Sequence, residues 1–161
     1  MKRPELLAPA GSLAMMRTAF AFGADAVYAG QPRYSLRVRN NDFGRLDTLA
    51  AGIREAHAAG KAFYLVSNIV PHNAKLRTYL QDMEEVVALA PDALIMADPG
   101  LIMMVRERWP EVDIHLSVQA NTTNHASVRF WQSVGVKRII LSRELSLDEV
   151  AEIRDACPDM E

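Results

Sequence analysis

Amide and hydroxyl side chains are concentrated in one short stretch of the sequence, Gln119-Ala120-Asn121-Thr122-Thr123-Asn124. Such groups can orient a ligand or a nucleotide base, and they can equally satisfy backbone groups in turns and cap helices. The stretch follows an apolar run that ends at Val118. We therefore expect Gln119 and Asn121 to contact a ligand, while at least one other member caps the helix that follows.

Arginines mark a second region, the irregular segment from Gln31 to Arg45, which contains Arg33, Arg37, Arg39 and Arg45. A guanidinium group matches the geometry of both phosphate and carboxylate. Long loops in compact domains are often functional, although the same charges could simply face water. We single out Arg37 as a group that holds a small anionic ligand.

Further candidates follow other apolar runs. Ser142-Arg143-Glu144 could bind a ligand with Arg143 and Glu144, or form a local ion pair. Asp98 precedes Pro99 and could be an acid, although a helix N-cap is the more common role for this pattern. The full set of expected ligand-binding residues is Arg37, Asn68, Asp98, Gln119, Asn121, Arg143 and Glu144, with Gln31, Ser67 and Ser142 at equivalent positions. The sequence identifies no catalytic residue.

Several classes of chemistry lack a sequence signature. The four histidines have no metal-ligand spacing, and His115 lies mid-strand, where a core histidine with satisfied hydrogen bonds is expected. There is no Gly-x-Ser-x-Gly nucleophile motif and no dinucleotide-binding glycine pattern. The net charge of −2 gives no global argument for nucleic-acid binding.

The expected location is the cytoplasm. The one cysteine, Cys157, cannot form an internal disulfide, which suits a reducing compartment. The N-terminus has no long apolar segment of the secretory type, and no apolar run approaches the ~20 residues that span a bilayer. We expect no membrane partner.

Six short apolar strands must position these candidates, with helical patterns between them. The strands are expected at residues 5–8, 26–29, 62–66, 93–96, 114–118 and 138–141, and the helices at 12–22, 46–59, 76–90, 99–109, 125–134 and 146–157. Continuous apolar strands indicate a parallel sheet covered by helices. The predicted class is therefore α/β, a (β/α)₈ TIM-barrel-like fold, of which residues 1–161 supply six of eight units as the N-terminal portion of a single domain.

Six segments, in order along the chain, resemble motifs of the collagenase-like peptidase family of unknown catalytic type. They are residues 5–12 (ELLAPAGS), 23–30 (GADAVYAG), 35–37 (SLR), 97–100 (ADPG), 117–121 (SVQAN) and 142–146 (SRELS). Within that family the sequence is most similar to a branch that hydroxylates tRNA. The resemblance implies formation of 5-hydroxyuridine at the wobble position, with tRNA as partner and prephenate as hydroxyl source.

The resemblance also implies features outside this sequence. Several family members hold an iron–sulfur cluster, and the family signature with its paired cysteines follows the sixth helix, beyond Glu161. We thus expect no cluster within residues 1–161 and no activity of this segment alone. Two other functions stay open: a peptidase, as the family name says, and a non-catalytic module that binds a ligand or RNA.

Overall fold

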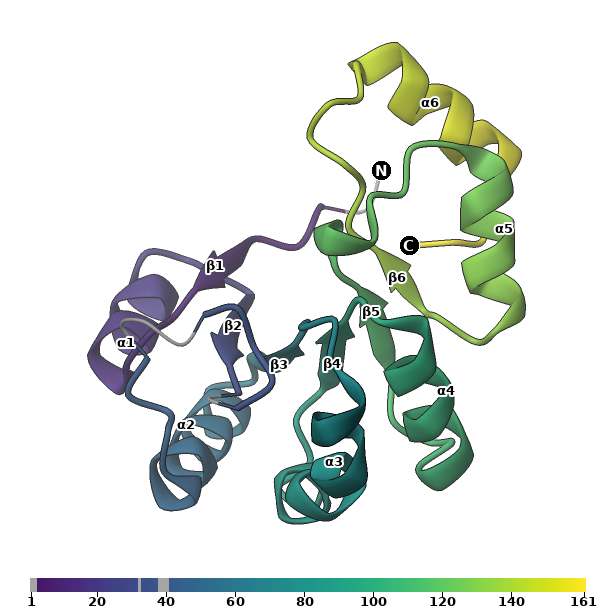
Figure 1. The fold of residues 1–161 in the computed structure, drawn as a ribbon. Helices are drawn as coiled ribbons and strands as arrows, with labels where there is room; N and C mark the ends of the chain where they lie inside the picture. Colours follow the sequence, from purple (N-terminus) through teal and green to yellow (C-terminus); the bar gives the residue numbers. More distant parts are fainter. Residues whose placement is uncertain (1–2, 32, 38–40) are drawn as a thin grey trace.

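A computed structural model describes residues 3–31, 33–37 and 41–161. Its strands form one sheet in the order β1 to β6, and every neighbouring pair is parallel. The sheet curls into a half-barrel, and the gap lies between β1 and β6 (Figure 1). The strands span Leu7–Pro9 (β1), Ala26–Gly30 (β2), Ala62–Ser67 (β3), Ala93–Met96 (β4), Ile114–Leu116 (β5) and Arg138–Ile139 (β6). The predicted sequential, parallel order is confirmed.

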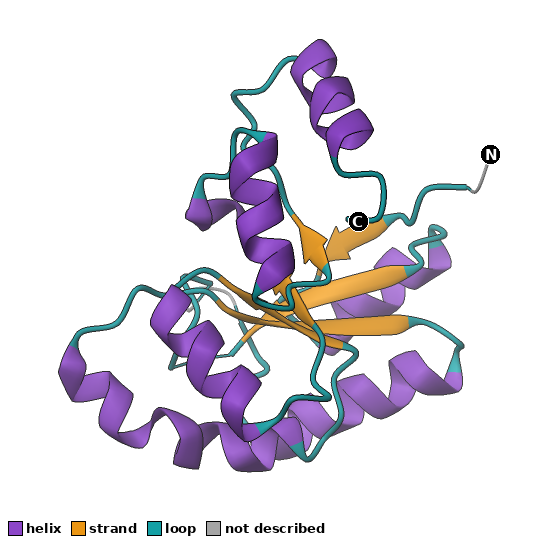
Figure 2. Ribbon diagram, turned by 90° about the vertical axis from the view of Figure 1, so that its right-hand side faces the viewer, coloured by secondary structure: helices purple, strands orange, loops and turns teal. Residues whose placement is uncertain are grey.

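The helices lie on the outer side of the sheet (Figure 2). They span Leu13–Ala21 (α1), Leu46–Ala58 (α2), Asn73–Val87 (α3), Pro99–Arg108 (α4), His125–Ser133 (α5) and Leu147–Ala156 (α6). Local signals set four of the starts, because Ser12, Asp98, Asn124 and Ser146 accept hydrogen bonds from the backbone of the first turn. The expected capping box of Ser146 and Glu149 is present.

Side chains alternate between the two faces of the sheet along each strand, and this alternation separates two apolar layers. One layer joins strand residues such as Phe63 and Leu65 to helix residues such as Met83, and it forms the core between sheet and helices. The other contains strand residues such as Tyr64 and Val66, and it lines the inside of the half-barrel. Successive side chains of a strand point to opposite faces, so β2, β3 and β4 each contribute to both layers. This double burial explains the continuous apolar runs in the sequence.

Some boundaries differ from the prediction. The first strand runs over 7–9 instead of 5–8, and the Leu6 backbone N–H before it donates to the Asp25 carboxylate at 2.9 Å. The fifth strand ends at Leu116, where a 3₁₀ turn over Val118–Ala120 begins. The sixth ends at Ile139 instead of 141.

The third helix also shifts, to 73–87 from the expected 76–90. It stops early because Ala90 has a φ of +55°, and a residue before proline disfavours the helical conformation.

The two borders of the half-barrel are linked by side chains. Arg138 of β6 forms an ion pair with Glu5, just before β1, at 2.7 Å. The Ile139 backbone N–H donates to the carbonyl of Glu161 at 2.7 Å, so the end of the described chain lies against β6. Both termini accordingly lie near this border (Figure 1). In the described part of the chain, no helix is both long and apolar enough to cross a membrane.

Candidate functional site

A cavity of about 370 Å³ lies inside the half-barrel at the carboxyl ends of the strands. Ligands bind at this end of the strands in parallel α/β proteins. Its wall combines apolar strand residues with polar loop residues: Leu7, Tyr28, Arg37, Val66, Asn68, Ile95, Ser117, Val118, Gln119, Ile140, Leu141 and Arg143. Four of the seven residues expected from the sequence therefore meet here. We call this cavity the barrel mouth.

Arg37 reaches the barrel mouth because the loop after β2 folds back over its own strand. At Gly30 an added Cβ would lie 2.8 Å from Ser35 Oγ and 2.9 Å from Arg37 Cβ, so only glycine allows this close approach. The Arg37 guanidinium then lies over the Tyr28 ring, 4.5 Å from its centroid, and donates to the Tyr28 hydroxyl at 2.8 Å. This packing holds a cation at the mouth of the barrel.

Asn68 connects three loops from beneath the cavity. Its Oδ1 accepts from the Leu36 backbone N–H at 3.1 Å, and its Nδ2 donates to Gln119 Oε1 at 2.8 Å and to Ser117 Oγ at 3.3 Å. Asn68 is only 6% exposed. A buried amide with both ends bonded is rigidly held, and so are the loops after β2, β3 and β5 that it joins.

Arg143 supplies the second cation of the barrel mouth. It is exposed and follows Ser142, which is buried. The alternative of a local ion pair is wrong, since no salt bridge joins Arg143 to Glu144 in this described loop. Glu144 lies outside the lining of the cavity, so the wall carries two guanidinium groups and no carboxylate.

Besides Glu144, two expected residues, Asp98 and Asn121, do not reach the barrel mouth. Asp98 caps α4, accepting from the Leu101 backbone N–H at 2.8 Å, as its proline-flanked position favours. Asn121 ends the 3₁₀ turn in the left-handed conformation with φ +50° and is exposed. Asn121 is not among the residues that line the cavity, although Gln119 of the same turn is.

The remaining polar positions have structural partners. Ser67 is fully buried and bonds the Tyr79 hydroxyl at 2.9 Å on the helix side of the sheet. Gln31 is buried, and its Oε1 accepts from the backbone N–H groups of Arg33 and Tyr34, each at 2.7 Å. These bonds shape the loop after β2. Arg39 lies outside the described residues.

Residues not singled out from the sequence form a second polar group inside the half-barrel, toward its other end. The Tyr64 hydroxyl donates to Glu5 at 2.8 Å, and burial, followed by this bond, raises the pKa of Tyr64 to about 12. His115 packs edge-on against Tyr64 with ring centroids 4.6 Å apart. Alternation within the short strands is the one signal that could have placed Tyr28, Tyr64, His115 and Arg138 on the inner face.

The expectation that His115 has satisfied hydrogen bonds is wrong. Its Nδ1 is buried without a hydrogen-bond partner, and burial, followed by repulsion from Arg138, lowers the pKa of the ring to about 4. His115 is therefore neutral at pH 7. Among the described residues no group of three or more histidine, cysteine, aspartate or glutamate side chains could hold a metal ion.

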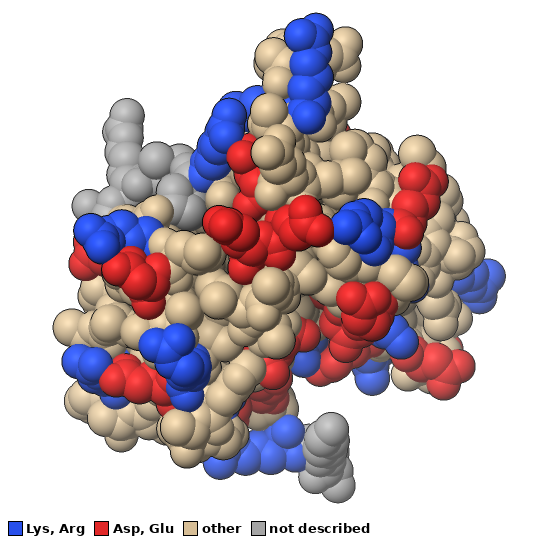
Figure 3. All heavy atoms as spheres, turned by 90° about the horizontal axis from the view of Figure 1, so that it is seen from below, with Lys and Arg blue, Asp and Glu red and all other residues tan. Residues whose placement is uncertain are grey.

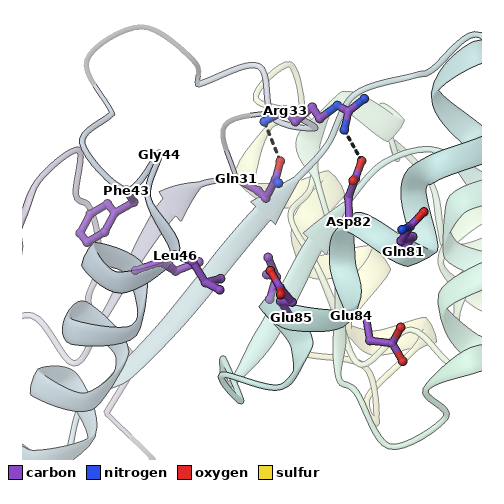
Figure 4. Close-up of a pocket in the computed structure, with 11 residues that line it drawn as sticks. Gln31, Arg33, Phe43, Gly44, Leu46, Gln81, Asp82, Glu84 and Glu85 are labelled. Atoms are coloured by element: carbon purple, nitrogen blue, oxygen red, sulfur yellow. Dashed lines mark hydrogen bonds and ion pairs between the residues drawn. The ribbon is translucent and has the colours of Figure 1, made fainter.

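A larger cleft of about 600 Å³ lies outside the sheet, between α2 and α3 (Figure 4). Arg33 is paired there with Asp82 at 2.6 Å, so its charge is neutralised. Glu84 and Glu85 add negative charge to the rim. Because this cleft lies outside the half-barrel and its negative charges repel anions, we place the functional site in the barrel mouth instead.

Comparison with known proteins bears on the fold. A solved U32 peptidase superposes with a TM-score of 0.77 at 15% identity, covering 97% of this chain and 66% of that one. At this identity the likeness concerns the fold alone. It confirms the TIM-barrel-like architecture that the strand order predicts.

Sequence relatives are much closer. The chain is 66% identical over 161 residues to tRNA hydroxylation protein P of Escherichia coli, covering 100% of this chain and 35% of that protein. It is 65% identical over 159 residues to tRNA hydroxylation protein P of Haemophilus influenzae, covering 99% and 34%. The chain thus spans about a third of the length of the curated relatives it matches. The model of peptidase family U32 matches residues 11–161, and the chain belongs to this family.

Proposed function

We propose that this chain is the N-terminal part of an RNA-modifying enzyme that forms 5-hydroxyuridine at the wobble position of tRNA. The observation that carries the proposal is the barrel mouth, where Arg37 and Arg143 face a cavity without a carboxylate in its wall. The names of the two relatives, tRNA hydroxylation protein P, supply the reaction and the RNA substrate.

The barrel mouth is suited to a small anionic co-substrate. Two guanidinium groups favour carboxylates through charge-assisted hydrogen bonds, and the apolar strand residues below them fit a carbon skeleton. Prephenate, the hydroxyl source that the family resemblance implies, is an anion of this kind. We propose that it binds here, with its carboxylates toward Arg37 and Arg143.

RNA contact is proposed on the loop side of the half-barrel, around the same mouth. The face seen from below in Figure 3 carries interspersed positive and negative side chains instead of a basic field. Several charges of the described chain are also paired, for example Arg108 with Glu84 at 2.9 Å. A surface of this kind provides little attraction for a phosphate backbone.

The residues of this chain do not fit an iron–sulfur cluster, which takes several thiolates. Cys157 is the one cysteine, it is buried, and its Sγ donates to the His125 carbonyl at 3.7 Å. We propose that any cluster of the full-length protein is bound outside residues 1–161.

The test replaces Arg37 with alanine in the full-length protein, expressed in a strain that lacks the gene. Loss of a charge-assisted hydrogen bond costs about 1.5–3 kcal/mol, or about 10- to 100-fold in binding. We expect tRNA 5-hydroxyuridine, measured by mass spectrometry of nucleosides, to fall when the co-substrate is limiting, with little change in melting temperature. Arg54→Ala removes an exposed arginine of α2 as a control. Unchanged modification in Arg37→Ala would refute the role of this residue.

The family name favours a peptidase as the second candidate. Among the described residues, however, no serine or cysteine side chain is hydrogen-bonded to a histidine side chain, so this segment shows no activated nucleophile. Loss of casein cleavage in the deletion strain without a nucleoside change would support the peptidase. Loss of neither would leave a binding module.

A further inference from the structure

We propose that Gln119 recognises a hydrogen-bond acceptor of the bound anion through its amide NH₂ group, and that Asn68 is the positioning residue that fixes this orientation. The inference rests on the proposed function of the barrel mouth and specifies how the site selects its ligand. It follows from a chain of hydrogen bonds whose direction is set by one backbone group.

The backbone N–H of Leu36 determines the orientation of Asn68. A backbone N–H can only donate, so the Asn68 atom that it meets at 3.1 Å must be the carbonyl oxygen, Oδ1. The other end of the Asn68 side chain is then the NH₂ group, which can only donate. Because Asn68 is 6% exposed, water does not offer it an alternative arrangement.

The Asn68 NH₂ group determines in turn the orientation of Gln119. It donates to Gln119 at 2.8 Å, so the accepting atom is the Gln119 carbonyl oxygen, Oε1. The Ser117 hydroxyl accepts from Asn68 at 3.3 Å and donates to the same Oε1. Both hydrogen bonds from the protein thus go to one end of the Gln119 amide.

The Gln119 NH₂ group therefore remains available to donate to a ligand in the barrel mouth. In the described part of the chain its Nε2 has no hydrogen-bond partner, although Gln119 lines the cavity. The ligand therefore meets an N–H donor from Gln119 beside the guanidinium groups of Arg37 and Arg143. A set of donors with no carboxylate selects oxyanions and carbonyl oxygens and disfavours cationic ligands.

Asn68 couples this donor to the first cation. Leu36, which it holds, directly precedes Arg37, and the Arg37 backbone N–H donates to Ser35 Oγ at 3.0 Å. Movement of Asn68 would thus disturb Gln119 and the loop of Arg37 together. We expect changes at Asn68 and Gln119 to be non-additive.

The first arm of the experiment measures prephenate binding to the full-length protein by calorimetry. Gln119 is exposed, so replacing it should leave folding intact. Gln119→Met removes both ends of the amide while keeping the length of the side chain, and Gln119→Glu keeps the acceptor for Asn68 and Ser117 but replaces the donor with an anionic acceptor. We expect binding to weaken about tenfold with Met and further with Glu. Gln132→Met, on the exposed face of α5, is the matched control and should bind normally.

The second arm observes the amide directly. In protein labelled with ¹⁵N-glutamine, the Gln119 NH₂ signals are identified by their loss in Gln119→Met. They should shift when prephenate is added to the unchanged protein. Asn68→Asp keeps the acceptor for Leu36 but loses the donors, so the shift of the Gln119 signals should disappear. The further change Gln119→Met should then weaken prephenate binding only a little. A purely structural role of Asn68 would leave the shift in place.

Equal prephenate binding by the unchanged, Gln119→Met and Gln119→Glu proteins would overturn the inference and leave the proposed function standing. If the unchanged protein binds no prephenate, the proposed co-substrate is wrong. The inference is then decided by tRNA 5-hydroxyuridine in cells, where Gln119→Glu should still lower the modification. A normal nucleoside level in that variant would overturn it.

Discussion

His115 is the clearest case of a single residue under electrostatic stress in this structure. Its ring is buried in the half-barrel beside Tyr64, and Nδ1 has no hydrogen-bond partner. The ion pair between Arg138 and Glu5 lies in the same polar group. Burial disfavours the charged form of the ring, and protonation would also place a second positive charge near Arg138, so the pKa of His115 falls to about 4.

This residue predicts acid sensitivity. In the unfolded chain histidine titrates near pH 6.5, so between about pH 6.5 and 4 the unfolded state binds a proton that the folded state does not. Stability should therefore fall as the pH is lowered through this window, by at most about 3 kcal/mol. His115→Phe keeps the ring packing and removes the titration.

Urea unfolding of the full-length protein at pH 7 and pH 4.5 measures the effect. We expect a smaller loss of stability on acidification in His115→Phe than in the unchanged protein. His72→Gln, which changes an exposed histidine, should keep the full pH dependence. An equal loss in His115→Phe would show that other groups cause the acid sensitivity.

At the scale of elements, the contact between α2 and the sheet depends on a small residue. Gly52 lies in the middle of α2, where an added Cβ would be 2.8 Å from the Phe43 ring and 3.2 Å from the Phe63 ring. These two rings pack edge to face, with centroids 5.5 Å apart, and both are buried. Neither can move aside easily, so the glycine sets how closely α2 approaches β3.

Gly52→Ala should consequently destabilise the protein. An alanine in a helix is ordinarily favoured over glycine by about 0.5–1 kcal/mol, but overpacking a core costs about 1–3 kcal/mol. We expect a net loss of stability in thermal unfolding. In the double variant with Phe43→Leu the methyl group gains space, so the two losses should not add. A higher melting temperature for Gly52→Ala alone would contradict this packing argument.

At the scale of the whole molecule, the half-barrel has two borders, formed by the outer edges of β1 and β6. Strand β6 is partly covered, because the Glu161 carbonyl accepts from Ile139 at 2.7 Å. The outer edge of β1 has no strand beside it in the sheet order. Unpaired strand edges add further strands or aggregate.

Residues 1–161 expressed alone should therefore self-associate and unfold at a lower temperature than the same residues in the full-length protein. Sedimentation velocity over a range of concentrations tests the association, and thermal unfolding tests the stability. The preparation should also lack iron–sulfur absorbance, since one cysteine cannot supply the usual ligands. A monomer that melts as cooperatively as the full-length protein would contradict the first expectation, and visible cluster absorbance the second.

The sequence by itself determined the repeating βα order, the parallel sheet and most helix starts. These features follow from local patterns, such as apolar runs for buried strands and the caps Ser12, Asn124 and Ser146. It also placed candidate ligand residues after the strands, because this architecture binds ligands there. The predicted strand ends were less accurate, for example at residues 140–141, since hydrogen-bond pairing with neighbouring strands decides where a strand ends.

Only the tertiary structure decided which candidates converge. Arg37, Asn68, Gln119 and Arg143 line one cavity, whereas Asp98 caps a helix and Asn121 ends a 3₁₀ turn outside the cavity lining. The loop after β2 also folds Arg37 over Tyr28, and the curl of the sheet brings His115 beside Tyr64. These outcomes depend on the register and curvature of strands far apart in sequence and on loops folding back over them. No local pattern of residues encodes that geometry.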